Sequence, residues 1–200
     1  MPPFIMTLAM QQTVRGICLL ASDGRSVRGN SEFLAELGTG SILGISYTGL
    51  IYIVFALITA FILQKTAFGR ATYAIGGSEE TARLSGINIC KQKMFVYAYS
   101  GIMVAIGSIL LVARLKSSIE PTIGTNYEMD AITAAIIGGT SMSGGSGRVL
   151  GTVVGTLIVA VLSNILNLMN VGSYIQTVVM GLIIFFAVAA DTWTNKGKRD

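Results

Sequence analysis

Long stretches of this chain carry no charged residue, and they divide it into apolar segments separated by polar ones. The clearest uncharged and mostly apolar runs are residues 42–63, 94–113, 149–166 and 173–190. A helix of about 20 apolar residues is long enough to cross the hydrocarbon core of a bilayer. Each of these runs therefore predicts a transmembrane helix.

Two further segments fit the same pattern less regularly. Residues 3–20 are apolar except for Arg15 and a few polar side chains, and residues 131–147 are uncharged throughout. The second segment is apolar only as far as Ile137 and then becomes rich in Gly and Ser. The pattern predicts an all-α, polytopic transmembrane helix bundle of about six spans, of which the fourth is short or broken and ends in a loop.

The overall composition supports a membrane protein. Hydrophobic residues make up 52% of the chain and charged residues 12%, and the mean hydropathy is +0.68. Soluble domains carry roughly 25% charged residues. The 24 glycines fit as well, because Gly is more frequent in transmembrane helices than in soluble ones.

The positive charges predict which side of the membrane each loop occupies. Lys and Arg gather in cytoplasmic loops, and here they concentrate in residues 64–93 and in the C-terminal tail: Lys65, Arg70, Arg83, Lys91, Lys93, Lys196, Lys198 and Arg199. The loop after residue 113 has Arg114 and Lys116 near its start but also contains Glu120, Glu128 and Asp130. Six spans then place both termini and the 64–93 loop in the cytoplasm, with the acidic loop outside the inner membrane.

Several chemistries have no residues to support them. The chain has no His, and Cys18 and Cys90 stand in no metal-binding spacing. We expect no catalytic residue and no metal site. The glycine-rich run before Arg148 does not match the G-x-x-x-x-G-K-[ST] pattern of a phosphate-binding P-loop. Gly147, Gly151 and Gly155 recur at every fourth residue instead, which favours close packing between helices.

The most informative polar stretch is a short helix predicted inside the 64–93 loop. Ser78 is a suitable N-cap, and Glu79 and Glu80 follow it in the first turn, where the helix dipole favours acids. Gly86 suits the left-handed position that ends a helix. A helix of about two turns is not stable alone. It therefore needs a supporting surface, either its own bundle or another protein.

Polar residues within apolar segments are candidates for a transport path. Asn164 and Asn167 are three residues apart and share one helix face, where they could line a polar path or form hydrogen bonds between helices. Tyr127, Glu128 and Asp130 are predicted to lie at an outer mouth. They could bind a sugar, or they could be ordinary solvated residues at a helix start.

Two long strings resemble signatures of a known family. They are Gly69-Arg70, Tyr73-Ala74-Ile75-Gly76-Gly77, Glu79 and Ala82-Arg83-Leu84-Ser85-Gly86-Ile87-Asn88, and Tyr127-Glu128-Met129-Asp130-Ala131-Ile132 followed by Gly138-Gly139-Thr140-Ser141-Met142-Ser143-Gly144-Gly145. They are similar to the bacterial ABC-type monosaccharide permeases of the ribose, xylose and galactoside group. The resemblance covers nearly the whole chain, and makes residues 1–200 a membrane-spanning permease domain with a cytoplasmic coupling loop at 64–93.

The resemblance implies a transport subunit rather than an enzyme. Its partners would be a cytoplasmic ABC ATPase that binds ATP and Mg, a periplasmic sugar-binding protein, a second permease copy and the lipid bilayer, with no cofactor in this chain and no nucleic acid. The short inner helix would carry the motion of the ATPase to the spans. Its coupling residues would be Glu79, Glu80, Ala82, Arg83, Gly86, Ile87 and Asn88, with Ala82 and Gly86 seated in a groove of the partner.

The resemblance also has departures and alternatives. The chain begins where the second half of such permeases begins, which implies that several N-terminal helices are absent, and Asn126 stands where the family has Gly. A truncated remnant, a related branched-chain amino acid permease and a self-contained secondary transporter or channel are the alternatives. The last is disfavoured, because no acidic residue lies inside an apolar run and no internal repeat is visible.

Overall fold

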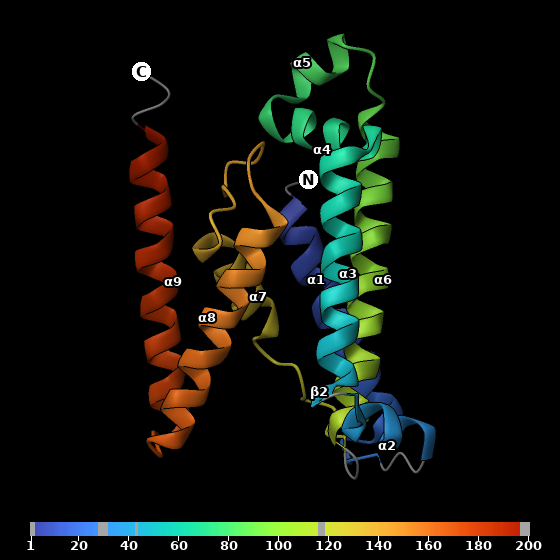
Figure 1. The fold of residues 1–200 in the computed structure, drawn as a ribbon, viewed down its shortest axis with the longest axis vertical. Coiled ribbons are helices and arrows are strands. Elements are labelled where there is room, and N and C mark those ends of the chain that lie inside the picture. The colour runs from blue at the N-terminus through green and yellow to red at the C-terminus, as the bar shows by residue number, and fades with distance from the viewer. Residues whose placement is uncertain (1–2, 28–31, 43, 116–118, 197–200) are drawn as a thin grey trace. The chain divides into compact units, whose positions relative to one another are not determined.

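The computed structural model describes residues 3–27, 32–42, 44–115 and 119–196, most of them in helices (Figure 1). The helices of this described part are α1 (Pro3–Ser22), α2 (Glu32–Thr39), α3 (Tyr47–Lys65), α4 (Ala67–Gly77), α5 (Glu79–Leu84), α6 (Ile89–Leu115), α7 (Tyr127–Ile137), α8 (Val149–Leu168) and α9 (Ser173–Lys196). Two short strands, β1 (Ser41–Ile42) and β2 (Ile45–Ser46), form an antiparallel hairpin. The mainly helical class predicted from the sequence is confirmed.

Three helices, α3, α6 and α8, are long and apolar enough to cross a membrane, judged by length and composition over the described residues. They coincide with the uncharged runs 42–63, 94–113 and 149–166. The most apolar windows of α3 and α6 contain no buried residue. Such uncovered apolar surfaces are unfavourable in water and are matched by lipid or by another subunit.

The other three predicted spans form helices of different character. α1 and α9 correspond to residues 3–20 and 173–190, but neither is among the three helices that meet the length and hydropathy criteria for a span. The 11 residues of α7 extend about 16 Å, roughly half of the hydrocarbon core. α7 ends at Ile137, where the sequence changes to Gly and Ser. The total of about six spans stays a prediction.

The chain divides into two compact units, the first formed by residues 1–51 and 102–125. In this unit the second predicted span begins later than expected, at Tyr47 rather than Ile42. Ile42 lies in the hairpin, where Gly44 adopts a φ of +84° that turns the chain back. Gly38, in the unpredicted helix α2, lies so close to the Ala113 carbonyl of α6 that a side chain would not fit there.

The second unit contains residues 52–101 and 126–200. Within it, the hydroxyl groups of Thr59 in α3 and Tyr99 in α6 share a hydrogen bond of 2.7 Å. The closest helix pair is α7 with α8. There is no room for a side chain between Gly151 and the Gly138 carbonyl, or between Gly155 and the Ala134 carbonyl.

The contact between α7 and α8 can be compared with the ridge of small residues predicted from the sequence, Gly147, Gly151 and Gly155. The ridge is confirmed for Gly151 and Gly155, which let α7 and α8 approach closely. Gly147 precedes α8 and faces the side chain of Thr140 in the loop, so it is not part of the helix interface.

Candidate coupling site and substrate path

The short helix predicted in the 64–93 loop is present as α5, and its two ends are formed by the residues expected. Thr81 N donates to Ser78 Oγ at 3.2 Å, which caps the first turn. Ile87 N donates to Ala82 O at 3.1 Å after the last turn, and Gly86 between them has a φ of +80°. This left-handed residue ends the helix at low cost only because it is a glycine.

The two faces of α5 differ in exposure. Ala82 is 1% exposed and packs inside the chain, whereas Leu84 is 85% exposed. Glu80 and Arg83 are exposed as well. The interpretation that Ala82 sits in a groove of a partner therefore does not agree with the structure, since this chain itself covers the side chain. We call Glu80, Arg83 and Leu84 the α5 outer face, because they are exposed and, unlike the exposed Glu79, their side chains form no hydrogen bond or ion pair with the described residues.

Residues at the start of α6 hold α4 and α5 in place. Lys93 forms an ion pair with Glu79 of α5, and Lys91 N donates to Asn88 Oδ1 at 3.1 Å. Gln92 Nε2 donates to Phe68 O and to Thr72 Oγ1, both at 2.9 Å, and thereby joins α6 to α4. α4 was not predicted as a helix, although α5 packs against it.

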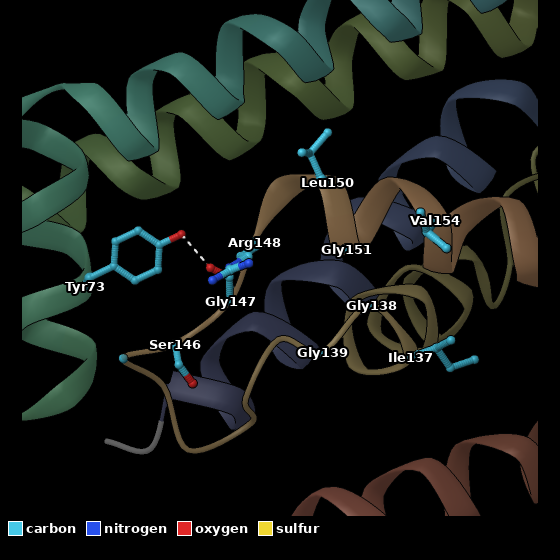
Figure 2. Close-up of a pocket in the computed structure, with 11 residues that line it drawn as sticks. Tyr73, Ile137, Gly138, Gly139, Ser146, Gly147, Arg148, Leu150, Gly151 and Val154 are labelled. Atoms are coloured by element: carbon cyan, nitrogen blue, oxygen red, sulfur yellow. Dashed lines mark hydrogen bonds between the residues drawn. The ribbon is translucent and has the colours of Figure 1, made fainter.

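Loop 138–148, which joins α7 to α8, lies against the same end of α4. The Tyr73 hydroxyl donates to Gly147 O at 3.0 Å, and Figure 2 shows this bond beside a cavity of about 810 Å³. A methyl group built on Gly76 would come within 2.5 Å of Gly145 N. No pattern in the sequence predicts this contact, although both segments contain adjacent glycines, Gly76-Gly77 and Gly144-Gly145.

The three residues assigned to an outer mouth lie in the first turn of α7. α7 extends about 10 Å from Ala134 back to Tyr127, while α8 extends about 20 Å from the facing Gly155 to Leu168. The start of α7 therefore falls well short of the far end of α8. Tyr127, Glu128 and Asp130 thus form a helix start beside α8, as one of the two interpretations had it, and their place at an outer mouth stays a prediction.

Asn164 and Asn167 both have exposed side chains on α8. Gln176 Nε2 of α9 donates to Asn167 Oδ1 at 2.9 Å and to Val171 O at 2.9 Å. For Asn167, the structure thus shows the interhelical hydrogen bond that was one of the two interpretations. Gln176, which supplies this bond, is a polar residue within the uncharged run 173–190.

The described residues contain no group of three His, Cys, Asp or Glu side chains placed to hold a metal ion. Cys18 and Cys90 are both exposed and unpaired with each other. The polar chemistry of this part of the chain therefore rests on hydroxyl, amide and carboxylate groups.

A family model described as "Branched-chain amino acid transport system / permease component" matches residues 3–188. The chain belongs to this permease family. The family consists of transport components rather than enzymes, and together with the apolar helices the match makes this a multi-pass inner-membrane protein.

Several similar curated proteins are sugar permeases by name. The ribose import permease protein RbsC of Haemophilus influenzae is 42% identical over 199 residues, which cover 98% of this chain and 61% of that protein. RbsC of Bacillus subtilis is 42% identical over 193 residues, covering 96% and 60%. The L-arabinose transport system permease protein AraH of Escherichia coli is 38% identical over 195 residues, covering 98% and 59%.

This chain therefore spans about 60% of the length of the relatives it matches. No solved structure matches it.

Proposed function

We propose that this chain acts in the permease subunit of an ATP-driven ABC importer that carries a monosaccharide across the inner membrane. The ribose and L-arabinose permeases named among its relatives favour a sugar. The description of the family model names branched-chain amino acids, which keeps an amino acid permease as the alternative. The identity to sugar permeases over almost the whole chain supports the sugar.

The single observation that carries the coupling role is the construction of α5. It is capped at both ends, supported from behind by α4 and α6, and exposes Leu84 at its tip. Leu84 is 85% exposed beside the exposed charges of Glu80 and Arg83, so this tip offers a partner an apolar contact flanked by charged groups. We infer that the α5 outer face docks on a cytoplasmic ATPase, with Glu79, Gly86, Ile87 and Asn88 shaping the helix from its ends.

The arrangement of the second unit supports the proposed orientation. Loop 138–148 contacts α4, so α7 ends and α8 begins on the side of the membrane that holds the coupling loop 64–93. α9 turns back after α8 and contacts α7 (Figure 1). This path supports a cytoplasmic C-terminus and a six-span domain over residues 1–200, in which α7 is the short fourth crossing.

The remaining partners are those of an ABC importer. No P-loop occurs in this chain, so ATP and Mg would be bound by the ATPase partner and no cofactor by the permease itself. A periplasmic sugar-binding protein would deliver the substrate, and a second permease copy would complete the pore in the bilayer. We expect no nucleic acid among its partners.

A substrate path would follow the polar start of α7 and the amides of α8. Tyr127, Glu128 and Asp130 lie in the first turn of α7 beside α8, where they would line the outer mouth of the path. Asn164 and Asn167 would continue the path toward the outer end of α8. Carboxylate, amide and phenol groups provide the donors and acceptors that sugar hydroxyls require.

The coupling role is tested by Leu84→Asp, with Leu84→Met as the matched control. Because Leu84 is exposed, the acidic variant should fold normally and yet lose co-purification with the ATPase and ATP-dependent uptake of D-ribose in proteoliposomes. The Met variant should keep both. If Leu84→Asp, Glu79→Lys and Gly86→Trp all leave association and uptake intact, the coupling role is wrong.

The same proteoliposomes distinguish the second class of function. Uptake of D-ribose driven by an ion gradient in the absence of ATP and of the ATPase would support a secondary transporter. Uptake of leucine instead of ribose, with ATP, would support the amino acid permease.

A further inference from the structure

We propose that α4 and loop 138–148 form a mechanical link that carries movement of α5 to α7 and α8, with Tyr73 as the positioning residue of that link. The inference deepens the proposed function and rests on it. In this arrangement the coupling helix acts on the spans through the α7–α8 loop as well as through its own flanking helices α3 and α6.

The first step of the link joins α5 firmly to α4. Ser78 ends one helix and begins the other, because Ser78 N donates to Ala74 O at 3.1 Å while Ser78 Oγ accepts from Thr81 N at 3.2 Å. Ala82, one turn along α5, is buried. With one residue capping both helices, a force on the α5 outer face displaces the end of α4 as well.

The second step is a backbone contact between two glycine pairs. A methyl group on Gly76 would lie 2.5 Å from Gly145 N, and one on Gly145 would lie 2.8 Å from Gly77 Cα. Contacts at that range leave no flexible side chain between the two backbones to absorb a displacement. A movement of Gly76-Gly77 must therefore displace Gly144-Gly145.

The third step connects the loop to the spans. Tyr73 holds Gly147 by its hydrogen bond of 3.0 Å, and the next residue, Arg148, accepts a hydrogen bond from Thr152 N in the first turn of α8. At the other end of the loop, Gly138 packs directly on Gly151 of α8. Both ends of the loop are thus fixed to the α7–α8 pair.

A cavity lies beside the link formed by α4 and loop 138–148. The cavity of about 810 Å³ in Figure 2 lies among Tyr73, the loop and the start of α8. The Tyr73 hydroxyl and the glycine pairs are contacts by which α4 holds the loop at the edge of this space. Single substitutions can therefore weaken the link without disturbing a packed core.

Two substitutions with matched controls test it. Tyr73→Phe removes one hydroxyl, and Tyr97→Phe is its control, because Tyr97 is 57% exposed and its hydroxyl has no hydrogen bond to the described residues. Gly145→Ala adds a methyl group against Gly77 at a φ of +73°. Gly24→Ala is its control, because Gly24 lies outside the link and has a φ of +66° with open space around it.

The first measurement does not depend on transport. Hydrogen–deuterium exchange of the full chain in detergent should be about two- to tenfold faster for the amides of residues 146–152 in Tyr73→Phe, the effect of losing one hydrogen bond. Tyr97→Phe should leave it unchanged. Equal exchange in the two Phe variants would show that Tyr73 does not hold the loop and would overturn the link.

The second measurement uses proteoliposomes that contain the ATPase and the binding protein. In Tyr73→Phe and Gly145→Ala, D-ribose transported per ATP hydrolysed should fall several-fold while the ATPase stays bound; the two controls should keep the wild-type ratio. An unchanged ratio overturns the proposal. So does loss of ATPase binding, which would make Tyr73 a mere support of α5. If the wild-type chain transports no ribose with ATP, the proposed function fails, and the exchange measurement still decides whether the link exists.

Discussion

The side-chain amide of Gln176 in α9 donates a hydrogen bond of 2.9 Å to Asn167 Oδ1 in α8. The same nitrogen donates to Val171 O at 2.9 Å, so both of its hydrogens are used within the turn between the two helices. Asn170 in this turn has a φ of +54°, a left-handed conformation that Asn tolerates better than most residues. The polar groups near the end of α8 therefore fix the reversal of the chain.

Asn167→Ala should lower the free energy of unfolding by about 0.5–2 kcal/mol, the usual range for hydrogen bonds between membrane helices. Asn164→Ala is the matched control on the same helix, and should have little effect. Titration of the purified chain with SDS in mixed micelles measures both. If instead both variants reduce D-ribose uptake without a loss of stability, the two amides line the transport path rather than fix the turn.

The long helices of this fold could be predicted from the sequence, because a helix that crosses lipid needs an uninterrupted apolar run of about 20 residues. Uncharged runs of sufficient length correspond to α3, α6 and α8. α4 was missed because Gly69, Gly76 and Gly77 lower its helical propensity. Gly69 is nevertheless required, since the turn from α3 leaves no room for a side chain beside the Leu63 carbonyl.

The same contrast holds at the candidate site. The caps of α5 follow from residues within one turn of each other, so the spacing of Ser78 and Gly86 was enough to place the helix. The contact between Gly76 and Gly145 joins residues that are far apart in the chain, and no local pattern pairs them. The burial of Ala82 was likewise unpredictable, because it depends on how α5 folds back on α4.

Gly155→Leu should separate α7 from α8. The side chain would meet the Ala134 carbonyl directly, and backbone cannot move aside as a flexible side chain would. We expect a loss of more than about 2 kcal/mol, at the upper end of overpacking effects. Gly181→Leu in α9 is the control, because nothing lies near that glycine. The fraction of chain that stays monodisperse in size-exclusion chromatography after heating in detergent measures the difference, and equal fractions would contradict the packing argument.

Ser78→Ala should loosen α5 by removing the acceptor for Thr81 N, at a cost of about 1 kcal/mol. Amides of residues 79–85 should then exchange about fivefold faster with deuterium, by the free energy of one cap. Ser78→Asp is the control, because a carboxylate both accepts the hydrogen bond and interacts favourably with the helix N-terminus. Faster exchange in Ser78→Asp to the same extent would show that the cap does not stabilise α5.

Reversing the ion pair between Glu79 and Lys93 tests whether Glu79 stabilises α5 within this chain or contacts the ATPase. Their side chains are 58% and 44% exposed, so the pair should contribute no more than about 1 kcal/mol to stability. Glu79→Lys alone should give a modest loss that diminishes at high salt, because salt screens exposed charges. Adding Lys93→Glu restores the pair in reverse and should recover the stability in SDS titration.

The same reversed pair then decides what Glu79 contributes to coupling. If Glu79 only positions α5, ATPase co-purification should also recover in the double variant. If the ATPase itself contacts Glu79, co-purification should stay weak although stability has returned. The α5 outer face was defined without Glu79, because its carboxylate is engaged by Lys93, so we expect recovery. Lys91→Glu, which changes the neighbouring charge without reaching this pair, serves as the control and should restore neither property to Glu79→Lys.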